Sequence, residues 1–165
     1  MDNIRIAKMQ SSDWPQVSAI YQQGLDSGLA TFQTEVPSYE QWNQSHLEQL
    51  RYVALNAHDS ILGWVAVSAV SSREVYRGVL EHSIYIANEV KHQGVGHALM
   101  SHLISESERQ GYWTLMASVF PENTASTHLH EKLGFRKIGR REKIACHQGI
   151  WRDTWLYERR SKIAG

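Results

Sequence analysis

Hydrophobic and polar residues alternate along Val79–Ile86, and this period of two predicts a β-strand. The even-numbered side chains from Leu80 to Ile86 fall on one face, and the odd-numbered ones, Glu81 among them, fall on the other. Glu81 therefore lies in mid-strand among apolar neighbours, where burial of an unpaired carboxylate is costly. That position makes Glu81 a candidate for a functional role.

A glycine-containing loop follows this strand and leads into an amphipathic helix, in which Leu99 and Leu103 recur at helical spacing. A strand, a Gly-x-Gly loop and a helix can together direct free backbone N–H groups and the positive end of the helix dipole at a phosphate. The same arrangement is also common as a simple tight turn, and the loop lacks the third glycine of the dinucleotide fingerprint and the Gly-Lys-Ser/Thr of a P-loop. The loop and the first helical turn comprise Lys91, His92, Gln93, Gly94, Val95, Gly96, His97 and Ala98.

The remaining apolar patterns predict further strands and helices on both sides of this unit. Alternating or continuous apolar runs indicate strands at residues 4–8, 52–55, 61–69, 113–120, 135–145 and 150–157. Helical spacing indicates a helix from residue 13 that gives way to a loop at 24–34, a helix at 39–50, and a short helix that ends at residue 133.

Capping residues mark the starts of two of these helices. Ser11 or Ser12 is the expected cap of the first, and Ser38 and Gln41 have capping-box spacing at the start of the second. The resulting order is β-α-α-β-β-β-α-β-α-β-β. It predicts an α/β fold in which a mixed, mostly antiparallel sheet of six to seven strands carries helices on both faces.

Length, charge and cysteine content narrow the class of protein. The 165 residues carry no formal net charge and are expected to form one domain, 1–165. Because the sequence has no basic tract, nucleic acid is not expected as a partner. No apolar run approaches the roughly 20 residues that span a membrane, and MDNIRIAKMQ has no signal-peptide core, so no membrane partner is expected. Cys146 is the only cysteine, which favours a cytoplasmic protein without disulfides.

Two motifs, in this order and spacing, resemble the GCN5-related N-acetyltransferase (GNAT) family, and the resemblance covers essentially the whole chain. Residues 90–98 are similar to the family's pyrophosphate loop, Gln/Arg-x-x-Gly-x-Gly/Ala, with Lys91 at the leading position. Asn123-x-x-Ser126 and residues 130–135 are similar to the family's Asn-x-x-Ala/Ser and Tyr-x-x-x-Gly-Phe helix, with His130 in place of tyrosine. The resemblance implies the GNAT fold and acetyl transfer from acetyl-CoA to an amine.

Four shorter segments narrow the resemblance to one branch of the family. Residues 29–32 (LATF), 81–86 (EHSIYI), 129–131 (LHE) and the Gly-x-Trp-x-Asp at 149–153 look like those of phosphinothricin and methionine sulfoximine acetyltransferases. By this resemblance, the enzyme acetylates the α-amine of a small amino acid or analogue, such as methionine sulfoximine, methionine sulfone or phosphinothricin. Members of this branch are often dimers.

The resemblance assigns acetyl-CoA to the glycine loop and to the strand before it. Backbone N–H groups of residues 94–98 would hold the pyrophosphate. Lys91, His92 and His97 would assist, although each is alternatively an ordinary solvated side chain. The strand would offer backbone groups to the pantetheine arm, as an added β-strand does. Besides the loop and first turn, the residues expected to contact acetyl-CoA are Ile84, Tyr85, Ile86, Asn123 and Ser126.

The same resemblance assigns catalytic roles to Glu81 and His130. An ammonium group has no lone pair for attack on a thioester, so Glu81 is expected to act as the general base, directly or through a water. The alternative for Glu81 is a structural carboxylate paired with Arg77 or a histidine. His130 is expected to protonate the departing thiolate or to form a hydrogen bond to its sulfur, and its alternative is an ordinary helix histidine.

Substrate binding is expected at Phe32, Tyr76 and Arg77. The two aromatic rings would wall a small pocket, and the Arg77 guanidinium would bind the substrate carboxylate bidentately. Arg77 is alternatively a surface arginine at the end of a loop. His128 and His130 are two residues apart on a helix and face different ways, so no metal site is expected.

Two rival functions also fit this sequence. A GNAT enzyme acting on a protein amine or an amine antibiotic is one rival, and a non-catalytic CoA-binding module is the other. Glu81 argues against the second rival, because a binding module has no use for a base. A homodimer is expected because the last strand concentrates large apolar side chains at Trp151, Trp155, Leu156 and Tyr157.

Overall fold

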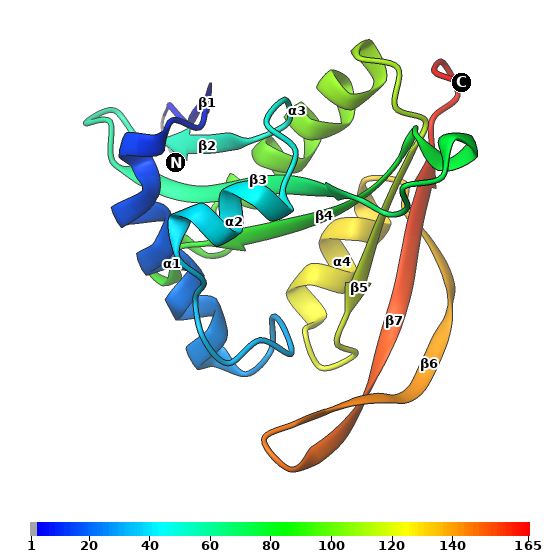
Figure 1. Ribbon diagram of the computed structural model, residues 1–165. Coiled ribbons are helices and arrows are strands. Elements are labelled where there is room, and N and C mark those ends of the chain that lie inside the picture. The colour runs from blue at the N-terminus through cyan, green and yellow to red at the C-terminus, as the bar shows by residue number, and fades with distance from the viewer. Residues whose placement is uncertain (1–2) are drawn as a thin grey trace.

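Seven strands form one sheet in the order β1-β2-β3-β4-β5-β7-β6 in the computed structural model, which describes residues 3–165 (Figure 1). Neighbouring strands are antiparallel except for β4 and β5. The strands are β1 (Arg5–Lys8), β2 (Tyr52–Leu55), β3 (Ile61–Ala69), β4 (Val79–Ile86), β5 (Thr114–Val119), β6 (Arg136–His147) and β7 (Ile150–Arg160). The α-helices are α1 (Trp14–Ser27), α2 (Tyr39–Ser45), α3 (Val95–Arg109) and α4 (Thr124–Lys132). Short 3-10 helices are η1 (Ser11–Asp13), η2 (Glu74–Tyr76) and η3 (Asn88–Val90).

The observed order of strands and α-helices confirms the predicted one, and three local details differ. The first helix begins with η1, where the Asp13 carboxylate accepts the N–H of Gln10 at 2.8 Å, so neither Ser11 nor Ser12 is its cap. This helix continues into the predicted loop, as far as Ser27. The capping box of α2 forms as predicted, but the helix ends at residue 45 because His46 already has extended backbone angles.

The sheet opens between β4 and β5, and this opening positions the site. The two parallel strands pair only over Val79↔Thr114, Leu80↔Leu115 and Glu81↔Met116. Both strands continue beyond these pairs, but β4 then pairs only with β3, and β5 only with β7. The second half of β4 therefore has an edge without a strand partner, directly after Glu81.

Alternating side chains of β4 contact different helices on the two faces of the sheet. Tyr85 packs against the Tyr21 ring of α1, with ring centroids 4.8 Å apart, and against Trp64 of β3 at 4.9 Å. Gly24 of α1 lies so close that a Cβ there would be 2.4 Å from the Tyr85 ring, so α1 can approach β4 only through a glycine. Ile86, on the other face, lies beside the start of α3. This confirms the predicted faces of the strand.

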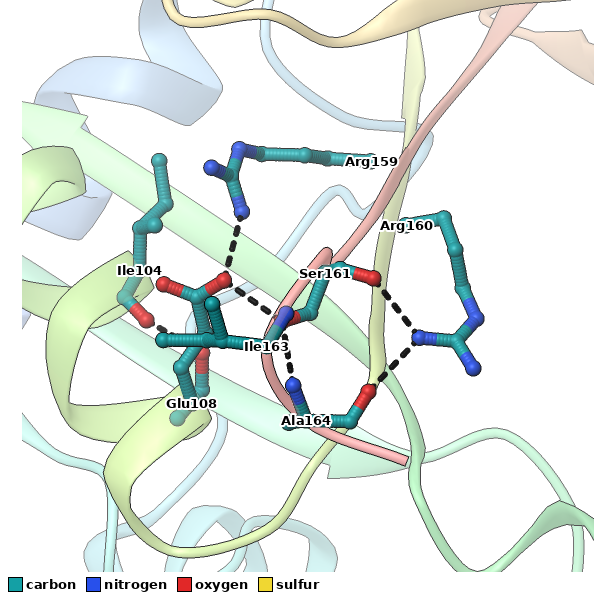
Figure 2. Close-up of polar contacts among 8 residues, drawn as sticks. Ile104, Glu108, Arg159, Arg160, Ser161, Ile163 and Ala164 are labelled. Atoms are coloured by element: carbon teal, nitrogen blue, oxygen red, sulfur yellow. Dashed lines mark hydrogen bonds and ion pairs between the residues drawn. The ribbon is translucent and has the colours of Figure 1, made fainter.

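The C-terminal tail anchors β7 to α3 (Figure 2). The Ser161 hydroxyl donates to the Glu108 carboxylate at 2.6 Å, and Arg159 donates to the same oxygen at 3.4 Å. The Arg160 guanidinium donates to the carbonyls of Ser161 and Ala164, both at 2.8 Å. The bonds to Glu108 hold the end of β7 to α3, while β7 pairs along its length with β5, the far wall of the opening.

Candidate active site

Two cavities meet at the opening of the sheet. The first, of about 270 Å³, lies between β4 and β5, and we call it the strand cavity. The second, of about 450 Å³, lies between β4, the loop before α3, and α4, and we call it the loop cavity. Both cavities are lined by Ala30, Ile84, Tyr85, Asn123 and Ser126, which mark their junction. A ligand in one cavity can therefore react with a ligand in the other.

The loop cavity has the charge and backbone geometry of an anion site. Gly94 has φ +87° and lies directly before α3, whose first N–H groups have no partner within the helix. Among the described residues that line the cavity, none is acidic and five are basic. These are Lys91, His92 and His97 on the loop and α3, and His128 and Lys132 on α4.

Most of the residues predicted to contact acetyl-CoA line this cavity, and two do not. Ile84, Tyr85, Ile86, Val95, Gly96, Asn123 and Ser126 line it, in addition to Gly94 and the basic residues of the loop. The Gln93 side chain instead donates to the carbonyl of Glu89 at 3.5 Å, and the Ala98 N–H donates to the Gly94 carbonyl inside the helix. His128 and Lys132 were not predicted, because only the packing of α4 against the loop brings them to the cavity.

Asn123 also has a structural role at the junction. Its side-chain oxygen accepts the N–H of Ser126 at 3.2 Å and thereby caps α4. Its side-chain nitrogen donates to the carbonyl of Leu29 at 3.1 Å. Asn123 therefore ties the start of α4 to the loop after α1, and this contact closes one side of both cavities.

Glu81 lies at the point where β4 and β5 separate and lines the strand cavity. The sequence argument expected an apolar, buried environment, and this is wrong: Glu81 is exposed, although it pairs with Ser68 of β3 and Met116 of β5. No hydrogen bond or ion pair joins Glu81 to Arg77 or to a histidine within residues 3–165. The carboxylate is thus open to both a ligand and bulk water.

His130 lies in a buried pair with His82, a residue to which the sequence assigned no role. The two rings stack with centroids 5.1 Å apart, and their Nε2 atoms are 2.9 Å apart. His130 is 1% exposed and His82 is 4% exposed. Burial lowers the pKa of both imidazoles, and the neighbouring His130 lowers the pKa of His82 further. The pair is therefore neutral at physiological pH.

This geometry argues against His130 as the acid. Nδ1 of His130 lies 2.7 Å from the Ser126 carbonyl oxygen, which can only accept, so Nδ1 carries the proton of the neutral ring. Its Nε2 is then an acceptor and faces His82. With both nitrogens engaged inside the protein and the charged form disfavoured, His130 has no proton free for a thiolate.

The predicted substrate residues divide into one that lines the strand cavity and two that do not. Phe32 is half-buried there, edge-to-face with Phe120 at 4.8 Å. Tyr76 is 44% exposed and lines neither cavity. Arg77 also lines neither: it lies over the Trp113 ring at 5.3 Å and donates to the Glu74 carbonyl at 3.2 Å. These contacts favour the surface interpretation of Arg77.

Polar residues that sequence reasoning missed line the strand cavity instead. They come from the loop after α1, from β5 and from β7, and they are Thr31, Gln33, Ser118 and Thr154. The Thr154 hydroxyl is buried and has no hydrogen-bond partner among the described residues. No lysine or arginine lines this cavity in residues 3–165. Only the folded chain brings these segments together.

Residues 3–165 contain no group of three or more His, Cys, Asp or Glu side chains that could hold a metal ion. No helix among the same residues is long and apolar enough to cross a membrane.

Residues 11–135 match the Acetyltransferase (GNAT) family, so the chain belongs to this family and is an N-acetyltransferase. It is 32% identical over 157 residues to the phosphinothricin N-acetyltransferase of Alcaligenes faecalis, covering 92% of this chain and 79% of that one. It is 27% identical to the L-methionine sulfoximine/L-methionine sulfone acetyltransferase of Pseudomonas paraeruginosa, covering 86% of each chain. A phosphinothricin acetyltransferase from Sinorhizobium meliloti, solved in complex with acetyl-CoA, superposes with a TM-score of 0.86 at 26% identity, covering 95% of this chain and 88% of that one. The family and branch resemblance in the sequence is confirmed.

Proposed function

We propose that the loop cavity binds acetyl-CoA with its thioester at the junction of the two cavities. The observation that carries this proposal is a cavity with five basic and no acidic lining side chains, which ends on the start of α3. Backbone N–H groups there would bind the pyrophosphate. The unpaired edge of β4 at Ile84 and Tyr85 would hold the pantetheine arm, because both residues line both cavities. The solved relative in complex with acetyl-CoA supports acetyl-CoA as the ligand.

The amine substrate would then occupy the strand cavity, next to Glu81. The ammonium must lose one proton before its nitrogen can attack the thioester, and the Glu81 carboxylate would accept this proton. Since Glu81 is exposed, it can pass the proton to bulk water. The free amine then attacks the thioester carbonyl: the amide C–N bond forms, the C–S bond breaks, and the nitrogen loses its second proton while the CoA thiolate gains one by exchange with solvent. No covalent enzyme intermediate is formed. The chain's contribution is to position both substrates and remove the proton.

The substrate class that we propose is a small α-amino acid or analogue, such as methionine sulfoximine, methionine sulfone or phosphinothricin. The names of the relatives and the small volume of the strand cavity support it. One observation favours a second candidate, an amine without a carboxylate: no lysine or arginine lines the strand cavity in the described residues. An amine antibiotic or a protein amine would need no such cation.

Thiol release from acetyl-CoA separates the two candidates. We expect turnover with methionine sulfoximine, methionine sulfone or phosphinothricin, and none with the matching amine that lacks the α-carboxylate, because the carboxylate contributes to binding. Equal turnover of the decarboxylated analogue, or acetylation of peptide lysine alone, contradicts the amino-acid assignment and supports the second candidate.

We also propose that residues 1–165 form a single catalytic domain and that two copies of the chain form a homodimer. The predicted apolar tail is only partly available for it, because Tyr157 is fully buried against α4. Exposed apolar side chains lie instead along the β6–β7 hairpin, which extends away from the helices (Figure 1). They are Ile138, Ile144, Ile150 and Trp151. Light scattering at micromolar concentration should give twice the 18.9 kDa chain mass, and a monomer contradicts this proposal.

A cytoplasmic location is part of the same proposal. Cys146 is exposed and free in the structure, and it is the only cysteine of the sequence, so the fold gains nothing from an oxidising compartment.

A further inference from the structure

The buried His82–His130 pair is not used by the mechanism above, although both residues line the strand cavity. Histidine residues with 4% and 1% exposure are uncommon in a core unless their nitrogens are hydrogen-bonded. Three of the four ring nitrogens have partners: both Nε2 atoms bond each other, and Nδ1 of His130 bonds Ser126. The fourth, Nδ1 of His82, has no partner among the described residues.

The hydrogen bonds also fix which atoms carry protons. The Ser126 carbonyl requires the proton of neutral His130 on Nδ1, so Nε2 of His130 accepts. Nε2 of His82 must then donate to it, which leaves the lone pair of neutral His82 on Nδ1. The hydrogen bonds that run from Ser126 through His130 to His82 therefore end in one buried acceptor, Nδ1 of His82. A buried polar atom without a partner is destabilising, and a catalytic role is one recognised reason for a native protein to keep one.

We propose that His82 is a further catalytic residue, whose Nδ1 accepts a hydrogen bond from the amino group of the substrate and orients its lone pair at the thioester. This inference rests on the proposed function. His130 is a positioning residue in it: it touches no substrate atom and holds His82 in the tautomer that leaves Nδ1 free.

The location of the pair beside the junction supports this role. His82 is two residues before Ile84 on the same face of β4, and His130 is one helical turn after Ser126 on α4. Ile84 and Ser126 both line the junction where the thioester would lie. Glu81 and His82 point to opposite faces of β4. Both residues nevertheless line the strand cavity, which lies where β4 and β5 stop pairing.

Substitution of His82 by asparagine or by glutamine tests the roles of its two ring nitrogens one at a time. In His82→Asn the new side chain is too short to reach His130, but its oxygen can take the place of Nδ1, so this variant keeps the acceptor for the substrate. His82→Gln places an amide N–H near the original Nε2, so it keeps the bond to His130 and removes the acceptor.

We expect His82→Gln to lower kcat/KM for the amine at least about tenfold, the effect of one lost hydrogen bond. His82→Asn should keep more of this activity than His82→Gln. Thermal stability should follow the opposite order, because only the Gln variant keeps the bond to His130. KM for acetyl-CoA should stay unchanged in both variants. A purely structural role predicts the same order for activity and stability, and this result would overturn the proposal.

A second measurement on the wild-type protein does not depend on either variant folding. In the dead-end complex with CoA and the amine substrate, the ¹⁵N resonance of His82 Nδ1 should shift from its value with CoA alone, because Nδ1 gains a donor. An unchanged resonance at saturating amine overturns the proposal. Wild-type turnover of the same amine is measured alongside: its absence contradicts the proposed function itself, whereas turnover with an unchanged resonance contradicts only the role of His82.

Discussion

Glu81→Gln is expected to lower kcat at pH 7 by about 100- to 10,000-fold, the usual contribution of a positioned general base. The amide cannot accept the proton that the substrate ammonium must lose. Activity should recover in part at alkaline pH, where more of the substrate is already free amine. The measurement is a pH–rate profile of thiol release for the wild type and the variant.

Because Glu81 is exposed, its substitution should change catalysis without changing the stability of the fold. Because the side chain is not buried, the substitution leaves no unpaired charge or cavity inside the fold, and the melting temperature should stay unchanged. Affinity for acetyl-CoA should also be unchanged, since Glu81 does not line the loop cavity. Glu74→Gln, on the exposed turn before β4, is the matched control and should keep full activity. Near wild-type activity of Glu81→Gln at pH 7 contradicts a role for Glu81 as the base.

The order of the elements could be predicted because it depends on local periodicity and capping. The alternation along β4 and the helical spacing of α3 are each properties of a short stretch of sequence. The box of Ser38 and Gln41 formed as predicted, because a cap needs only residues three positions apart. The GNAT fold followed from the order of these elements together with the two family motifs.

The environment of the site residues could not be predicted in the same way. Glu81 is exposed and forms the last pair between β4 and β5, and no local pattern records the register between two strands that are separated by a helix. The His82–His130 pair joins residues 48 positions apart, so neither residue alone indicates the other. Arg77 shares a strand face with Glu81 in an extended chain, but η2 ends at Tyr76 and turns Arg77 onto Trp113.

The basic residues that line the loop cavity could likewise be predicted from the sequence only in part. The sequence motif indicated the half of the cavity that a single loop and helix provide, with Lys91, His92 and His97. The other half comes from α4, where His128 and Lys132 read as ordinary surface residues. They reach the cavity because Leu129 packs against Gly96, where an added Cβ would lie 3.2 Å from the leucine side chain. Close approach of α3 and α4 therefore builds the anion site from two sequence segments.

Gly94→Ala is expected to weaken acetyl-CoA binding at least about tenfold, because a side chain at this position would displace the phosphates from the backbone N–H groups that bind them. Gly94 lines the loop cavity and has no protein atom within 4 Å of an added Cβ, so the new methyl group would point into open space that the ligand needs. Titration calorimetry of acetyl-CoA with the metal-free protein measures this affinity.

The substitution also strains the backbone, because Gly94 has φ +87°, and Gly111→Ala is the matched control for this strain. Gly111 has φ +90° and equally open surroundings, but it follows α3 at the opposite end of the helix and lines neither cavity. Both variants should lose about 1 kcal/mol of stability, the typical difference between alanine and glycine at positive φ. Only Gly94→Ala should lose affinity for acetyl-CoA. Equal affinity of the two variants contradicts the placement of the pyrophosphate at the start of α3.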